Sequence, residues 1–235
     1  MRRLAAIAFI LTLASVSAQA HATGLRAMGS WTMPKDSSYG ALSSDEWRGQ
    51  TLDLSFSYSF LYPGRIVLVD VEGGYIYNGE VQGSLYDTYP TDLEGHGMYL
   101  GVRFTARVNR KVLEWLQPYV RTDFGWSWNR VQISGASLPA MHDWGNGGFI
   151  YVGGGVQLTV PIAFIRKTMR IRLTQRFSIG LSYEFGYLQS APIKVKFEPT
   201  PTNSGDVEPI PVHGFSAGTL DLSGITHRFG VVIAF

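Results

Sequence analysis

The 235-residue sequence predicts an all-β fold, namely an eight-stranded, antiparallel, up-and-down transmembrane β-barrel. The first observation is a period-2 alternation in segments of about ten residues, with large apolar side chains on one side and small or charged ones on the other. The second observation is that long and short connections alternate between these segments. The third is the closing segment, where Phe229, Val231, Ile233 and Phe235 share one side and Arg228 lies on the opposite side.

The N-terminus has the pattern of an export signal. Two arginines precede an apolar run over residues 4–16, and cleavage after Ala20 or Ala22 fits a small-x-small site. The run is too short to cross a hydrocarbon core of about 30 Å as a helix. We therefore expect residues 1–20 to be a cleaved signal peptide and residues 21–235 to form the barrel.

The composition excludes several classes of function. Without Arg2 and Arg3 the chain has 18 basic and 18 acidic residues, so it lacks the basic surface that a nucleic-acid partner requires. The absence of cysteine excludes disulfides, thiolate metal sites and a cysteine nucleophile. Histidine and carboxylate residues do not cluster at metal-ligand spacing, and Gly153-Gly154-Gly155 does not open a helix. We expect no metal and no cofactor.

The first four expected strands are residues 25–33, 51–62, 65–80 and 98–108. Each has an apolar outward side and an inward side of hydroxyl, glycine and charged residues. In the second strand, six large apolar or aromatic residues oppose one threonine, one aspartate and three serines. The Pro63-Gly64 pair that follows is a tight-turn signal.

The last four expected strands are residues 119–131, 150–164, 171–187 and 218–235. The seventh is the most regular, because isoleucine, leucine, phenylalanine and tyrosine alternate there with Arg172, Arg176, Glu184 and small residues. A lysine or arginine on the lipid side costs about 2–4 kcal/mol at the midplane, so inward arginines fit a membrane barrel.

The connections predict the orientation. Outer-membrane barrels have long loops outside and short turns in the periplasm. With both termini in the periplasm, every long connection falls outside. The expected extracellular loops are about residues 34–49, 81–95, 132–147 and 190–217.

The lumen is expected to hold a network of charges. An eight-stranded barrel has an interior just wide enough for side chains to fill. The inward charged residues are Arg26, Arg103, Arg107, Arg121, Arg172, Arg176, Arg228, Asp53, Asp70, Glu72, Asp123 and Glu184. Buried charges must be paired, so we expect a side-chain plug. The alternative is a narrow, porin-like ion path, in which Gly153, Gly155, Gly180 and Gly186 leave room for water.

The predicted mature chain resembles the small eight-stranded outer-membrane barrels typified by the OmpA transmembrane domain and OmpX. The resemblance rests on the aromatic strand ending at Phe235, on Leu116-Gln-Pro-Tyr-Val120, and on the arm Ser178–Tyr187. It implies a location in the outer membrane of a Gram-negative-type cell. It also implies a terminal signal for the barrel-assembly machinery, carried by Phe229, Val231, Ile233 and Phe235.

The outer end of the fifth strand carries a candidate lipid contact. Trp126, Trp128 and Arg130 share the outward side, and arginine forks suit phosphate groups. The hypothesis is a contact with lipopolysaccharide head groups. The alternative is an ordinary aromatic girdle with a snorkelling arginine.

The sequence favours a structural or surface-interaction role, adhesin-like, with any extracellular ligand bound at the loops. The alternation at residues 193–197 predicts a protruding ribbon, which can bind other chains by strand addition. The second alternative is an enzyme acting on lipid A, with His96, His142 or His213 near the outer rim. Adjacent residues on a strand point in opposite directions, so His142 and Asp143 make a poor pair, and motifs of lipid A deacylases, palmitoyltransferases or omptins are missing.

Overall fold

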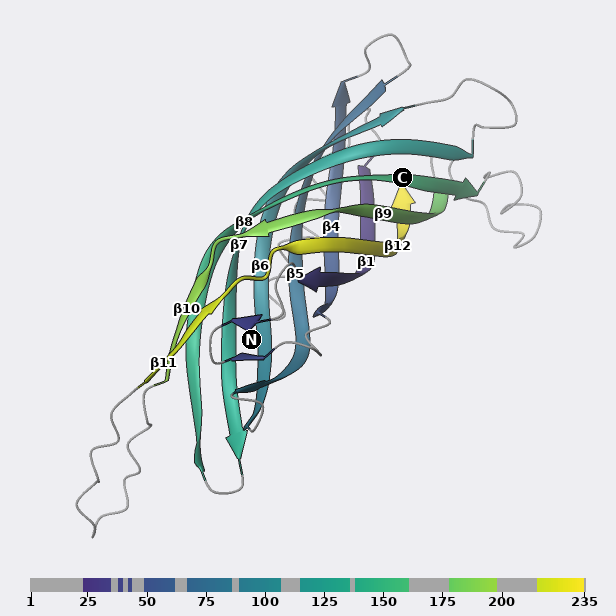
Figure 1. Ribbon diagram of the computed structural model, residues 1–235. Helices are drawn as coiled ribbons and strands as arrows, with labels where there is room; N and C mark the ends of the chain where they lie inside the picture. The colour runs from purple at the N-terminus through teal and green to yellow at the C-terminus, as the bar shows by residue number, and fades with distance from the viewer. Residues whose placement is uncertain are drawn as a thin grey trace, which may run out of the picture.

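The computed structural model describes residues 23–34, 38–39, 42–43, 49–61, 67–85, 89–106, 115–135, 138–160, 178–197 and 215–234. The described residues form these strands: β1 (Thr23–Pro34), β2 (Ser38–Tyr39), β3 (Leu42–Ser43), β4 (Gly49–Leu61), β5 (Val67–Leu85), β6 (Tyr89–Ala106), β7 (Leu116–Gly135), β8 (Leu138–Val160), β9 (Ser178–Ser190), β10 (Ile193–Phe197), β11 (Phe215–Leu220) and β12 (Gly224–Ala234) (Figure 1). Among these residues there is no helix long and apolar enough to cross a membrane. The expected signal peptide, residues 1–20, lies outside the described residues.

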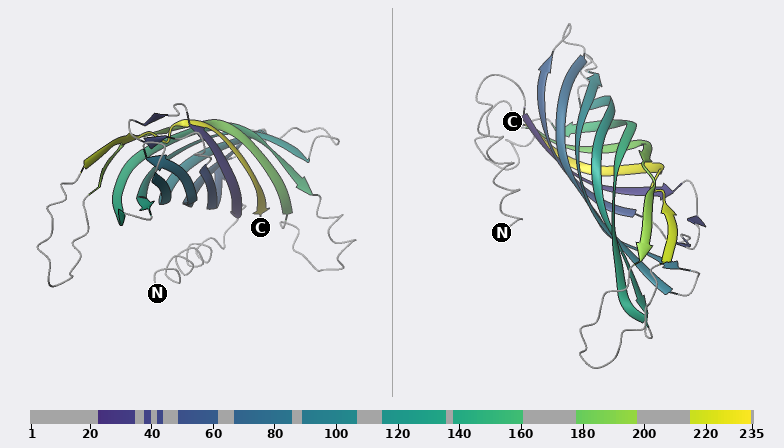
Figure 2. Two further views of the ribbon diagram at one scale, coloured as in Figure 1. Left: turned by 60° about the horizontal axis from the view of Figure 1, so that its bottom comes forward. Right: turned by 90° about the vertical axis from the view of Figure 1, so that its left-hand side faces the viewer.

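Eight of the strands close into an antiparallel barrel. Their order around the wall is β1-β4-β5-β6-β7-β8-β9-β12, and β12 pairs with β1 to close it. A line of paired residues that starts at Thr23 and crosses every strand returns to β1 at Met33, ten residues further along. This stagger tilts the strands against the barrel axis, and they curve strongly as they wind around it (Figure 2). The expected eight-stranded antiparallel barrel is confirmed.

The two ends of the barrel differ. At the terminal end lie Gly24 of β1 and its partner Ala234 of β12. At the opposite end, which we call the hairpin end, β5 runs to Leu85 before β6 returns at Tyr89, and β7 runs to Gly135 before β8 returns at Leu138. The stretches 81–95 and 132–147, expected as loops, are therefore mostly strand.

The physical reason for this difference is a reversal of polarity along the strands. Inside the expected membrane span the outward side is apolar, whereas in the extensions the outward side carries residues such as Asp92, Glu94 and Gln132. The inward side of the extensions is apolar instead, and Leu93, Val131 and Ile133 are no more than 2% exposed. Period-2 order thus continues past the membrane, with a conventional apolar interior and a polar outside.

Short strands occupy parts of the other two expected loops. Within 34–49, β2 pairs with β3, and β3 continues the sheet by pairing with β5 through Leu42 and Leu85. Within 190–217, residues 193–197 form β10, as their alternation predicts, and pair with β11. Both pairs of short strands lie towards the hairpin end of the barrel.

The β10–β11 ribbon lies against the inward side of the β8 extension (Figure 1). The β8–β9 ladder ends where the Ala191 amide donates to the Gly148 carbonyl at 2.8 Å, because Pro192 has no N–H to continue it. Beyond that point the Ile193 side chain lies over Gly145. The amide of Lys196 donates to a carboxylate oxygen of Asp143 at 2.7 Å. The ribbon is therefore attached to the wall.

A polar corner fixes the bend between the barrel and this ribbon. The Ser190 amide donates to the Ser223 hydroxyl at 2.9 Å, and the Leu222 amide donates to the Ser190 hydroxyl at 3.0 Å. The Asp221 carboxylate accepts from the Ser223 amide at 2.9 Å. Side chains thus satisfy backbone donors that leave the β9–β12 ladder.

The outer wall of the barrel is a continuous apolar surface. Leu100, Leu181, Val120, Phe124 and Val152 are each more than half exposed, and they come from four different strands. So large a patch of exposed apolar side chains marks a surface that meets lipid or another protein.

Inward glycines accommodate the rings of lumen tyrosines. A Cβ placed on Gly153 or Gly186 would lie 2.2 or 2.4 Å from the Tyr151 hydroxyl, and one on Gly155 would lie 2.9 Å from the Tyr119 hydroxyl. In the channel alternative predicted from the sequence, these positions leave room for water. The tyrosine rings occupy that space instead.

We expect Gly186→Ala to lower the free energy of unfolding by about 1–3 kcal/mol, because the methyl group would overlap both the Tyr151 ring and the Val152 carbonyl. The matched control is Gly29→Ala, since a Cβ there meets nothing within 4 Å and the change should stay within about 0.5 kcal/mol. Urea unfolding of the folded protein in detergent micelles measures both. Equal stabilities for the two variants would contradict this account of lumen packing.

Candidate functional site

The lumen holds a layer of nine buried charged residues, which we call the charge layer. Every barrel strand except β8 contributes to it, and no member is more than 6% exposed. Its members are Arg26, Asp53, Asp70, Glu72, Arg103, Arg121, Asp123, Glu184 and Arg228. Alternation places each of them on the inward side of its strand.

Arg121 of β7 is the residue that joins this layer together. Its Nε lies 2.7 Å from a carboxylate oxygen of Asp123 and 3.4 Å from one of Glu72. Its two Nη atoms lie 3.6 Å from Asp53 and 3.8 Å from Glu184. One guanidinium thus contacts carboxylates from four different strands, β4, β5, β7 and β9.

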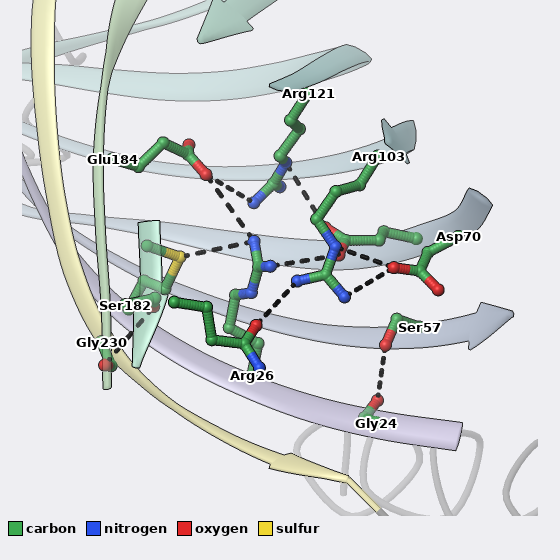
Figure 3. A network of polar contacts seen from close by, with 12 residues as sticks. Gly24, Arg26, Ser57, Asp70, Arg103, Arg121, Ser182, Glu184 and Gly230 are labelled. Carbon is green, nitrogen blue, oxygen red and sulfur yellow. Dashed lines mark hydrogen bonds and ion pairs between the residues drawn. The ribbon is translucent and has the colours of Figure 1, made fainter. Parts of the chain in front are cut away.

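Arg103 and Arg26 extend the layer to either side (Figure 3). Arg103 contacts Asp70 at 2.8 Å and Glu72 at 3.0 Å. Arg26 contacts Glu72 at 3.4 Å and Glu184 at 3.7 Å. Glu72 therefore links three arginines, because it also contacts Arg121.

Arg228 of β12 is the fourth arginine of the charge layer. Its Nη1 atom lies 3.4 Å from Asp53, 3.4 Å from Asp123 and 3.5 Å from Glu184. Each of the four arginines in the layer contacts at least two carboxylates. The paired charges meet the requirement for burying ions in a space from which water is excluded.

Tyrosine rings cover the faces of the same guanidinium groups. The Arg228 guanidinium lies 3.6 Å from the centre of the Tyr151 ring, and that of Arg121 lies 5.0 Å from the Tyr99 ring. Arg26 and Arg103 both lie over Tyr119, at 5.2 and 5.5 Å. These distances are within the range of cation–π attraction. β8 thus takes part in the layer through Tyr151.

An apolar cluster adjoins the charge layer on its hairpin side. It consists of Ile76, Tyr99 and Phe149, with Leu188 packed against it. Beside it is a small chamber of about 50 Å³, which has room for a few water molecules. Arg228 lines the chamber and also belongs to the charge layer, so the chamber borders that layer. Its remaining lining combines residues of the apolar cluster and Leu222 with hydroxyl and amide side chains from Ser30, Thr32, Thr51, Asn78, Ser127, Ser190 and Thr226.

Besides Arg26, the sequence predicts eleven charged residues in the lumen. The structure brings eight of these eleven together. They are Asp53, Asp70, Glu72, Arg103, Arg121, Asp123, Glu184 and Arg228. Arg107, Arg172 and Arg176 lie outside the described residues. Sequence reasoning missed the tyrosines as guanidinium partners. The available signal was an inward aromatic beside an inward glycine, as at Tyr151 and Gly153.

Three of the four residues assigned to the assembly signal lie on the outward side of β12. Phe229 and Val231 are exposed and Ile233 is half-buried, whereas Phe235 lies outside the described residues. Their role as a signal stays a prediction.

Of the histidines in the enzyme alternative, the two that the structure describes, His96 and His142, lie on different strands of the outer face. The Nδ1 atom of His96 lies 2.5 Å from the Tyr75 hydroxyl, on the outer wall. His142 is exposed on the outward side of β8, whereas Asp143 lies on the inward side and binds the Lys196 amide. His213 lies outside the described residues. In the part of the chain described, no group of three histidine or carboxylate residues is arranged so that it could hold a metal ion.

No protein-family model matches the chain, and no curated protein matches it in sequence. Its fold is similar to that of solved structures. OprG, an outer membrane protein of Pseudomonas aeruginosa, is 13% identical, with a TM-score of 0.48 over 92% of this chain and 97% of that one. Ail of Yersinia pestis is 13% identical, with 0.42 over 92% and 97%. Neisserial surface protein A is 10% identical, with 0.42 over 91% and 95%.

We expect Arg121→Met to lower the free energy of unfolding by about 3–5 kcal/mol, because it leaves several buried carboxylates without their shared cation. The control is Ser55→Ala, a buried lumen position whose hydroxyl has no hydrogen-bond partner in the described structure and whose loss should be close to neutral. Equilibrium unfolding in urea measures both. If Arg121→Met is as stable as the unmodified chain, the charge layer does not stabilise the barrel.

Proposed function

We propose that this protein is an outer-membrane barrel with a sealed lumen, and that it serves to hold its hairpins and the β10–β11 ribbon at the cell surface. Its role is structural or surface-interactive, as in an adhesin. The observation that carries this proposal is the combination of a lumen filled by buried charged residues that contact opposite charges with an apolar outer wall.

The outer wall supports the membrane location. A soluble barrel places charged residues on its water-facing side, whereas here the charges lie inside and exposed leucine, valine and phenylalanine residues lie outside. Barrels of the outer membrane show this arrangement, with an apolar band about 25 Å tall and a polar interior. The likeness to an outer-membrane fold and the export signal expected at residues 1–20 agree with this location.

The lumen supports a seal over the alternative ion path. A conducting path needs continuous water, yet the charged side chains are almost fully buried and bound to one another. Tyr119 and Tyr151 fill the space beside the inward glycines. The small chamber has room for only a few waters and borders the charge layer at Arg228.

The hairpin end supports the surface role. There the strands extend with an apolar interior around Leu93 and Ile133 and a polar outer face, which suits a structure surrounded by water. In the proposed orientation this end lies outside the cell and both termini lie in the periplasm. Any extracellular ligand then meets the β5–β6 and β7–β8 hairpins and the ribbon first.

An epitope inserted between Gly135 and Leu138 should be labelled by antibody on intact cells, because the β7–β8 connection then lies outside. The matched control is the same epitope inserted between Ala106 and Trp115, at the terminal end, which should be labelled only after the outer membrane is permeabilised. Labelling of both sites only after permeabilisation would refute display at the surface.

A further inference from the structure

A second feature lies on the outer face, towards the hairpin end of β6, β7 and β8. Pairing places Arg130 of β7 between Glu94 of β6 and Trp144 of β8. Trp128, two residues earlier on β7, pairs with Asn146 of β8. All five share the outward side of the wall, and we call them the tryptophan–arginine patch.

The position of the patch decides what it meets. Along β7 the outward residues Val120, Phe124 and Trp126 belong to the apolar wall, and Trp128 and Arg130 follow them towards the hairpin end. On β6 the outward residues change in the same way, from the apolar wall to the charged Glu94. The patch therefore begins where the apolar wall ends. In the proposed orientation, that is the level of the head groups in the outer leaflet.

The chemistry of the patch suits a phosphorylated sugar. The side chains of Trp128 and Trp144 are 42% and 57% exposed, so both rings present apolar area on either side of a cation. Within the described structure the Nε atom of Arg130 is buried and has no hydrogen-bond partner. Guanidinium forks bind phosphate oxygens in pairs, and aromatic rings pack against the C–H face of a sugar.

The other wall of the barrel provides a comparison. On β1, Trp31 is 41% exposed and its ring lies 5.8 Å from that of His227, which also contacts Phe185 and Tyr183. This cluster has aromatic rings at the boundary of the apolar wall but no arginine among them. An aromatic girdle alone therefore does not account for Arg130 between Trp128 and Trp144.

We infer that the tryptophan–arginine patch binds the phosphorylated saccharide of lipopolysaccharide in the surrounding outer leaflet. Arg130 binds a phosphate, Trp128 and Trp144 pack against sugar rings, and Glu94 and Asn146 accept or donate hydrogen bonds to sugar hydroxyls. This inference rests on the outer-membrane location proposed above. It extends the candidate contact of Trp126, Trp128 and Arg130 to residues of β6 and β8, and it specifies the phosphorylated saccharide as the part of lipopolysaccharide that is bound.

The test uses the folded mature chain in detergent micelles free of lipopolysaccharide. Isothermal titration calorimetry measures binding of lipopolysaccharide that carries inner-core sugars, of the same material without its phosphates, and of phosphatidylglycerol, an anionic lipid without a saccharide. We expect Arg130→Gln to weaken binding of the phosphorylated form about tenfold, the loss of one charge-assisted contact, and to leave the dephosphorylated form unchanged.

Trp144→Ala should weaken binding of both lipopolysaccharide forms several-fold, and Trp31→Ala, the control on the opposite wall, should weaken neither. Unchanged affinity in Arg130→Gln and Trp144→Ala would overturn the inference. An equal loss in Trp31→Ala, or phosphatidylglycerol binding as tight as that of lipopolysaccharide, would overturn it too.

Far-UV circular dichroism and electrophoretic mobility verify that each variant is folded. If the variants bind lipopolysaccharide as the unmodified chain does but the Gly135–Leu138 epitope is still labelled on intact cells, only the inference about this patch is wrong. If the epitope is not labelled on intact cells, the proposed function is wrong as well.

Discussion

The contact of Arg121 with four carboxylates is the interaction on which the barrel depends. A closed wall of eight staggered strands leaves an interior just wide enough for side chains, so the inward residues must fill it and neutralise one another. Arg121 meets both requirements, because it reaches Asp53, Glu72, Asp123 and Glu184 from a single position on β7. Removing a partner from such a set exposes the full cost of burying the charges that remain.

The rest of the lumen is arranged around these charges. Tyrosines stack on the guanidinium faces, and glycines on the same or neighbouring strands leave space for the tyrosine rings. The carboxylates bind the guanidinium edges and the rings cover the faces, so little room remains for water beside Arg121. Packing and neutralisation therefore reinforce each other, and a sealed lumen is the consequence.

Alternation predicted much of this directly from the sequence. The inward positions of Asp53, Asp70, Glu184 and Arg228 follow from period-2 order, since a strand with one lipid-facing side has only one other side for charges. The same rule predicted the closing strand and the β10 segment. It works because the membrane imposes one polarity on the outward side over the whole span.

Structure could not be predicted from the sequence where that polarity reverses or where contacting residues come from distant strands. Leu93 and Ile133 were assigned to polar loops, although polar outward residues are expected once a strand leaves the lipid, and both side chains are buried on the inward side. The stacking of Tyr151 on Arg228 depends on the stagger between β8 and β12, which are not adjacent in the wall. Local pattern has no information on that stagger.

Single-channel recording tests most directly whether the buried charge layer seals the lumen. The mature chain, folded and shown to be inserted in a planar bilayer, should give no conductance steps, because the paired charges and tyrosine rings leave no continuous water path. Small, reproducible steps whose size changes when Glu184 or Asp70 is replaced by its amide would contradict the seal. That result would establish the lumen as a narrow ion path instead.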